Sequence, residues 1–198
     1  MLYSFFALIS RMKNISRWSL MRNSAVENVQ EHSHMVAVIA HALAIIRRDI
    51  CGGVADPGMT AVAALFHDAS EIYTGDLPTP IKYFNPDIMS AYKRVEVIAS
   101  QKLLSALPAE MRLAYEALLS PGGDDPSVPL VKAADKLTAY IKCLEELKAG
   151  NLEFRLAAEQ SRKKLMALNM PEVDYFVEHF IPAFELTLDE LDFSFESI

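Results

Sequence analysis

The chain has 198 residues, of which 52% are hydrophobic and 23% charged, a balance typical of a globular protein that excludes an intrinsically disordered chain. Its 26 acidic residues outnumber the 19 basic ones and give a formal net charge of −7, which argues against binding a nucleic-acid polymer. The longest apolar run, residues 35–46, is shorter than the ~20 residues of a membrane span, and no positive region precedes the apolar N-terminus. We therefore expect a cytoplasmic protein without membrane contacts.

Apolar residues recur mostly at helical spacing along the chain, and no stretch alternates as a strand does. This predicts an all-α fold, a helical bundle that forms a single domain over residues 1–198. Asn28 with Glu31 indicates a capping box, and Asp56 followed by Pro57 indicates another helix start. In chain order, the predicted helices cover residues 2–12, 28–50, 56–73, 85–106, 108–120, 130–149, 152–168 and 171 onward to a disturbance at 182. We expect a connector over 14–26, a helix-free loop over 75–80 because of its two prolines, and another loop over 121–129.

The predicted helix over 56–73 carries the densest cluster of functional side chains. His67, Asp68 and Glu71 are three and four residues apart, so a helix would place them side by side. Their neighbours are mainly alanine, leucine and phenylalanine, which indicates burial. A buried imidazole and carboxylate without partners would cost several kcal/mol, so either a salt bridge or a divalent metal should compensate them.

Two distant residues extend this cluster to a metal-binding pattern. His32 lies in the first turn of the helix over 28–50, and Asp135 lies on the helix over 130–149. Each taken alone is most simply a structural residue, His32 at the surface and Asp135 paired with a lysine. Together with His67 and Asp68 they supply two imidazole nitrogens and two carboxylate oxygens. Such a set can hold one divalent ion and leave positions for water and a phosphate oxygen.

This spacing resembles the H…HD…D pattern of the HD superfamily, and finer features are similar to its 5′-deoxynucleotidase branch. The most specific feature is the Gly-Asp-Leu-Pro-Thr-Pro loop that follows the His-Asp dyad. The stretches that carry the resemblance are residues 15–18, 27–33, 67–71, 75–82, 132–136 and 142–147. The resemblance implies an all-helical HD fold and hydrolysis of deoxyribonucleoside 5′-monophosphates to deoxyribonucleosides and phosphate.

The resemblance also implies a metal and an assembly. His32, His67, Asp68 and Asp135 match the family's four metal ligands. The implied cofactor is one divalent transition metal, cobalt or manganese, and the implied assembly is a homodimer.

Five further positions match substrate-handling residues of the family. Glu71 and Asp76 match catalytic carboxylates that handle the attacking water and the leaving ribose oxygen, and which carboxylate does which stays open. Arg17 matches a phosphate-binding arginine, and Trp18 matches the residue beside the sugar that disfavours a 2′-hydroxyl. Asp76 and Thr79 match positions lining the same pocket. Without the resemblance, Trp18 is better interpreted as a hydrophobic anchor.

Three other functions are open. The same scaffold suits a cyclic-nucleotide phosphodiesterase or a nucleoside triphosphohydrolase, although the latter needs more basic residues than the loops provide. A non-catalytic helical dimerisation module could keep the metal as a structural cross-link. Such a module would be expected to lack Glu71, Asp76 or Arg17, and all three are present.

Overall fold

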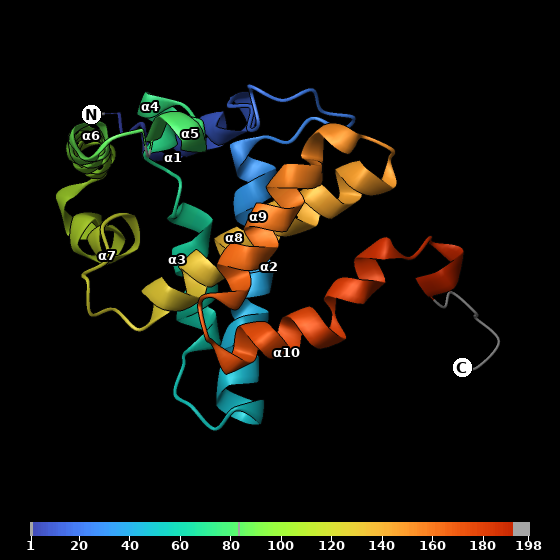
Figure 1. Cartoon of the computed structure of the whole chain (residues 1–198). Coiled ribbons are helices and arrows are strands. Elements are labelled where there is room, and N and C mark those ends of the chain that lie inside the picture. The colour runs from blue at the N-terminus through green and yellow to red at the C-terminus, as the bar shows by residue number, and fades with distance from the viewer. Residues whose placement is uncertain (1, 83, 192–198) are drawn as a thin grey trace.

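The computed structural model describes residues 2–82 and 84–191, with the backbone alone for Thr79. Within these ranges the chain is helical, with one isolated bridge between Ser16 and Asn28 and no strand, so the predicted all-α class is confirmed (Figure 1). The α-helices are α1 (Phe5–Ile9), α2 (Val29–Ile45), α3 (Pro57–Phe66), α4 (Glu71–Thr74), α5 (Thr79–Lys82), α6 (Pro86–Ser105), α7 (Ala109–Leu119), α8 (Ser127–Lys148), α9 (Arg155–Met166) and α10 (Pro171–His179). The short turns are η1 (Ser10–Asn14), η3 (Leu152–Phe154), η4 (Ile181–Glu185) and η5 (Asp189–Leu191), which are 3₁₀, and η2 (Ile46–Ile50), which is a π-helix.

The predicted helix starts are confirmed where local side chains cap them. The Asn28 side chain accepts the backbone N–H of Glu31 at 3.0 Å, and the Glu31 carboxylate accepts that of Asn28 at 3.3 Å, which is a complete capping box. Asp56 and Asn85 each accept a backbone N–H three residues further on, at 2.9 and 2.8 Å. These caps fix where α2, α3 and α6 begin.

The prediction of one continuous helix over 56–73 is wrong. Helix α3 ends at Phe66, residues 67–70 form a turn, and α4 begins at Glu71. The Ala64 carbonyl oxygen, which would accept the N–H of Asp68 in a continuous helix, instead lies 2.7 Å from Nδ1 of His67 and 3.4 Å from its backbone N. The imidazole therefore competes with the helix for its own acceptor, and the chain turns there.

Two further boundaries differ because prolines are tolerated in a first helical turn. Helix α5 begins at Thr79 and includes Pro80, so the prediction that 75–80 is free of helix is wrong at its end. Helix α8 begins at Ser127, three residues before the predicted start, and contains Pro129 in its first turn. Asp125 supports that start by accepting the backbone N–H of Ser127 at 2.8 Å.

Helices α2 and α8 cross at the centre of the molecule, with α3 packed on α2 and α9 packed on α8 (Figure 1). The core between them includes fully buried Val36, Leu43, Leu130 and Leu137. A second buried cluster around Phe5 joins α1 to α6 and to the turn after α3. This packing holds the backbones of α2, α3 and α8 together, so side chains that these helices carry toward one another can hold defined positions.

The stretch Val29–Ile50 is long and apolar enough, by length and composition alone, to cross a membrane. Its most apolar window has a mean hydropathy of 1.2, and 56% of that window is buried within the chain. Core helices of soluble proteins meet the same criterion, so this is weak evidence of a span. The packing of α2 against α3 and α8 accounts for its apolar sequence.

Candidate active site

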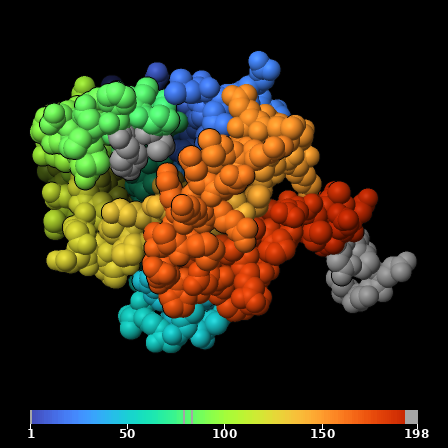
Figure 2. Space-filling view, viewed as in Figure 1, coloured from blue at the N-terminus to red at the C-terminus, as the bar shows by residue number. Residues whose placement is uncertain are grey.

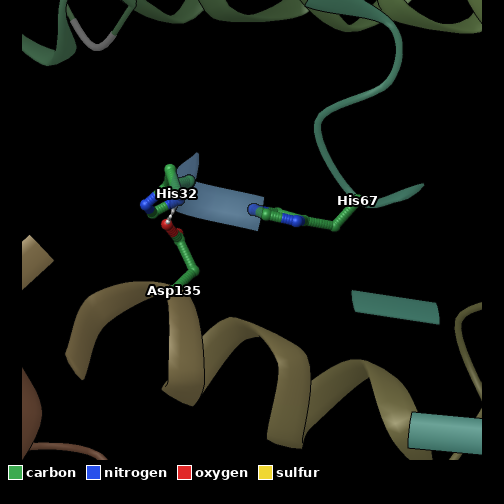
Figure 3. Close-up of side chains that lie close together, drawn as sticks. All are labelled: His32, His67 and Asp135. Carbon is green, nitrogen blue, oxygen red and sulfur yellow. Dashed lines mark hydrogen bonds and ion pairs between the residues drawn. The ribbon is translucent and has the colours of Figure 1, made fainter. Parts of the chain in front are cut away.

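Three of the four predicted metal ligands converge at the centre of the fold. His32 comes from α2, His67 from the turn after α3, and Asp135 from α8, and one ligand atom of each lies within 4.8 Å of the others. Figure 3 shows the His67 ring and the Asp135 carboxylate both directed at His32. His32 Nε2 lies 3.1 Å from Asp135 Oδ1. Asp68 adjoins this group, because its Oδ2 lies 3.1 Å from His67 Nε2 and 3.7 Å from His32 Nε2.

The hydrogen bonding of the His67 imidazole indicates that the cluster suits a metal. Nδ1 of His67 donates to the Ala64 carbonyl, so Nε2 is the nitrogen that can bind a metal, and it faces Asp68 Oδ2 at 3.1 Å. Metal-binding histidines are commonly oriented in this way by a carbonyl or carboxylate. Two carboxylates lie within 4 Å of these nitrogens, at Asp68 and Asp135. The donor set therefore fits one divalent ion with mixed nitrogen and oxygen ligation.

The electrostatics of the cluster favour a cation. Burial disfavours the charged form of both His67 and Asp68, yet their mutual attraction prevails. It raises the pKa of His67 to about 9 and, with His32 and Arg17, holds the pKa of Asp68 well below its usual range. In this structure positive charge is supplied to Asp68 by His67 and by Arg17, whose Nη1 lies 3.3 Å from Oδ2.

A cavity of about 430 Å³ opens beside the cluster, a size that suits a small-molecule ligand. The connector after η1, the segment around residues 76–82, and helix α9 border it and meet on one face in Figure 2. A second cavity, beside Asp56 and Ser127, measures about 50 Å³ and is too small for a nucleotide. Six predicted site residues line the large cavity, namely Arg17, Trp18, Asp68, Glu71, Asp76 and Asp135.

The two predicted catalytic carboxylates line this cavity, and their local environments differ. Glu71 begins α4 and is 7% exposed, and its Oε2 has no hydrogen-bond partner among the residues described. Burial, followed by the charges of Asp68 and Asp76, raises the pKa of Glu71 to about 9. Asp76 follows Gly75, whose φ of 69° places it in the left-handed region, and burial raises its pKa as well. Both groups hold a proton more readily than ordinary carboxyl groups.

Arg17 and Trp18, on the connector after η1, line the same cavity. Arg17 Nε donates to Glu27 Oε2 at 3.2 Å, and the indole Nε1–H of Trp18 donates to the same oxygen at 3.0 Å. The Trp18 ring packs on Phe154, with ring centroids 5.3 Å apart. The Arg17 guanidinium and the Trp18 indole therefore lie side by side, next to the His–Asp cluster.

Sequence reasoning gave no role to two features of the cavity. The first is Glu27, which contacts both Arg17 and Trp18. The second is the wall formed by α9, where Ala157, Gln160, Ser161 and Lys164 line the cavity at spacings of three and four residues. That helical spacing could have identified a common face, but not the direction in which the face points. Thr79 begins α5, and its side chain lies outside the described residues, so its pocket-lining role stays a prediction.

Comparison with known proteins identifies the family. The family described as 5′-deoxynucleotidase YfbR-like matches residues 4–184. The chain belongs to this family. The 5′-deoxynucleotidase of Vibrio parahaemolyticus is 50% identical over 188 residues, covering 94% of this chain and 97% of that protein. The corresponding protein of Photorhabdus temperata is 51% identical over the same length, covering 94% and 95%.

Solved structures confirm the predicted HD fold. An HD-domain phosphohydrolase from Listeria innocua superposes with a TM-score of 0.78 at 24% identity, covering 91% of this chain and 88% of that one. The HD phosphohydrolase of cyanophage S-2L, solved with dA and one catalytic Zn²⁺ ion, gives a TM-score of 0.57 at 20% identity, with 89% and 95% covered. These likenesses extend over nearly the whole of each chain.

Proposed function

We propose that this protein is a metal-dependent 5′-deoxynucleotidase that hydrolyses deoxyribonucleoside 5′-monophosphates to deoxyribonucleosides and phosphate. The observation that carries the proposal is its identity of about one half, over 94% of its length, to proteins named as 5′-deoxynucleotidases. The cavity supports it, because Arg17 lies there beside the His–Asp cluster.

His32, His67, Asp68 and Asp135 are the proposed ligands of one divalent metal. The mixed nitrogen and oxygen donors favour a transition metal, and cobalt or manganese is proposed over magnesium, which prefers oxygen ligands. When bound, such an ion lowers the pKa of water and neutralises negative charge on phosphate. Everything else in the reaction falls to the protein's own side chains.

Arg17 is proposed to hold the 5′-phosphate, since a guanidinium fork can donate two hydrogen bonds to phosphate oxygens as negative charge grows there. As the oxygen of water bonds to phosphorus, the bond from phosphorus to the 5′-oxygen breaks. Water loses a proton and the departing 5′-oxygen gains one. Glu71 and Asp76 are proposed to carry these two transfers, one as base and one as acid.

Sugar selection is assigned to the pocket wall. Trp18 is proposed to close the space beside the 2′-carbon, with Asp76 and Thr79 lining the same pocket. A 2′-hydroxyl buried there without a partner would cost about 1–3 kcal/mol, which is roughly 5- to 150-fold in discrimination. The contact of the Trp18 ring with Phe154 supports a rigid wall.

We propose a homodimer on the basis of the apolar surface that the chain exposes. Large apolar side chains are exposed on α2 and α3, including Val38 at 51% and Met59 at 53%, and we propose that such surface is covered in a homodimer. Light scattering during size-exclusion chromatography tests this proposal, and a monomeric mass would contradict it.

We also propose that the chain acts as one domain over residues 1–198 and that it lies in the cytoplasm, where cell fractionation should find it.

A metal-by-substrate screen of phosphate release tests the function. The purified protein, loaded in turn with cobalt, manganese, magnesium and zinc, is offered deoxy- and ribonucleoside mono-, di- and triphosphates and cyclic nucleotides. We expect the highest kcat/KM with deoxyribonucleoside monophosphates. Preference for a cyclic or triphosphorylated nucleotide would assign one of the rival enzymes. Metal binding without turnover of any substrate would favour the dimerisation module.

A further inference from the structure

We propose that Glu27 is a positioning residue for the substrate pocket, and that its single carboxylate sets Arg17 and Trp18 relative to each other. The inference rests on the proposed function, because it concerns the residues assigned to phosphate and sugar. It adds a determinant of sugar selectivity that does not itself line the cavity.

The geometry around Glu27 is that of a shared clamp. One oxygen, Oε2, accepts from Arg17 Nε at 3.2 Å and from Trp18 Nε1 at 3.0 Å. The other oxygen, Oε1, lies 3.9 Å from Nδ1 of His32, a buried nitrogen that has no hydrogen-bond partner among the described residues. The Glu27 side chain is 15% exposed, so water screens these contacts only partly. One carboxylate therefore contacts both the Arg17 guanidinium and the Trp18 indole, and it approaches the metal cluster.

Backbone pairing holds Glu27 opposite its partners. The backbone N–H of Arg17 donates to the Glu27 carbonyl at 2.9 Å, and that of Val29 donates to the Ile15 carbonyl at 2.9 Å. The two ends of the 17–27 loop are thereby closed against each other. This register brings a residue ten positions away beside Arg17 and Trp18.

Trp18 needs such a clamp for a conformational reason. Its φ is 58°, a left-handed backbone conformation that costs a bulky residue free energy. Phe154 packs against the ring and limits its movement, but this contact makes no directional bond to the indole N–H. The hydrogen bond from the indole N–H to Glu27 fixes the remaining freedom. Because the same oxygen holds Arg17, the distance between the phosphate site and the sugar wall is fixed as well.

A glutamine in place of Glu27 is the sharpest test. It keeps the volume and one acceptor oxygen but removes the charge, so the hydrogen bonds from Arg17 and Trp18 would lose the charge assistance that makes them strong. We therefore compare Glu27→Gln with Glu31→Gln. Glu31 is exposed, lies in the first turn of α2 four residues after Glu27, and makes the capping box instead of a pocket contact. The matched variant controls for damage to the start of α2.

Two readouts are measured in the metal-loaded protein. The first is the ratio of kcat/KM for dAMP over AMP, together with KM for dAMP. The second is the fluorescence of Trp18, the one tryptophan in the sequence, including its quenching by acrylamide. For Glu27→Gln we expect the ratio to fall roughly 10-fold or more, KM to rise, and the emission to shift to longer wavelength with stronger quenching. Glu31→Gln should leave the ratio and the emission at wild-type values.

The outcomes separate this inference from the proposed function. If wild type prefers dAMP and Glu27→Gln keeps both the preference and the native emission, the inference is overturned. If wild type shows no preference for dAMP, the proposed function fails, while the Trp18 emission still decides whether Glu27 holds the indole. Should Glu27→Gln not fold, Glu27→Asp provides the test. It keeps the charge but is one methylene shorter, so the same shifts are expected in weaker form, and wild-type values in both readouts overturn the inference.

Discussion

Replacing Glu146 with alanine removes a buried carboxylate that links helix α8 to the loop carrying Arg17 and Trp18. The Glu146 side chain is fully buried. It accepts hydrogen bonds from the backbone N and the hydroxyl of Ser24 at 2.8 and 2.6 Å and from the backbone N of Ala25 at 3.2 Å. Asn151 Nδ2 donates to it at 2.8 Å, and Lys142 forms a buried ion pair with it.

The loss should be large because the donors that remain are buried. Removing one partner of a buried ion pair typically destabilises a protein by about 3–5 kcal/mol, since the other charge is left unpaired. For a chain of this size, such a loss lowers Tm by roughly 6–20 °C. The loop should also loosen before the core does, so activity should fall more steeply with temperature than helix content.

Urea unfolding followed by circular dichroism measures the effect, with Glu145→Ala as the control. Glu145 is the neighbouring residue on the same helix and is exposed, so its loss should change the free energy of unfolding by less than about 0.5 kcal/mol. A Glu146→Ala protein within 1 kcal/mol of the control, on the order of a single hydrogen bond, would refute this reasoning.

The same contacts give a dependence on pH with a defined sign. Although burial opposes its charge, the bonds from Lys142, Ser24 and Asn151 hold the pKa of Glu146 well below its ordinary value of 4.5. A carboxyl whose folded pKa is lowered stabilises the protein above its unfolded pKa and loses that contribution as pH falls through the folded one. The difference in unfolding free energy between wild type and Glu146→Gln should therefore be constant near neutral pH and shrink below about pH 4.5. A difference that grows in acid would contradict this assignment.

The remaining predictions concern the site. His32→Ala and Asp135→Ala should each lose bound metal, measured by mass spectrometry of the purified protein, and lose activity with it; a full metal complement in either variant would remove that residue from the ligand set. Glu71→Ala and Asp76→Asn should keep the metal and the fold while turnover falls by roughly 10²-fold or more, and near-normal turnover in either would refute its role in proton transfer. Trp18→Ala should lower the preference for dAMP over AMP, whereas equal weakening of both substrates would make Trp18 a packing residue.

Much of the fold was predictable because its determinants are local. The capping box of Asn28 and Glu31 and the start at Asp56 depend on side chains within one turn of the backbone they cap. The break after Phe66 was not predictable from hydrophobic periodicity, which continues through it. It depends on the His67 imidazole bonding to a carbonyl of the preceding turn, a competition that a sequence pattern does not encode.

Some residues of the candidate site were likewise predictable from the sequence, and others were not. The pattern of His32, His67 and Asp135 on separate helices predicted a cluster, and the structure brings the three together. Glu27 received no role, because its contacts depend on the antiparallel pairing of two short segments that lack any strand signature. The α9 wall was missed because one face of a polar helix does not reveal which cavity it borders.

The ratio of kcat/KM for dAMP over AMP, measured on the metal-loaded wild-type protein, tests the proposed deoxynucleotidase activity most directly. We predict a ratio between roughly 5 and 150, the cost of leaving one hydroxyl buried without a partner. A ratio near one, with both monophosphates hydrolysed equally well, would contradict the assignment of this cavity to deoxyribonucleotides.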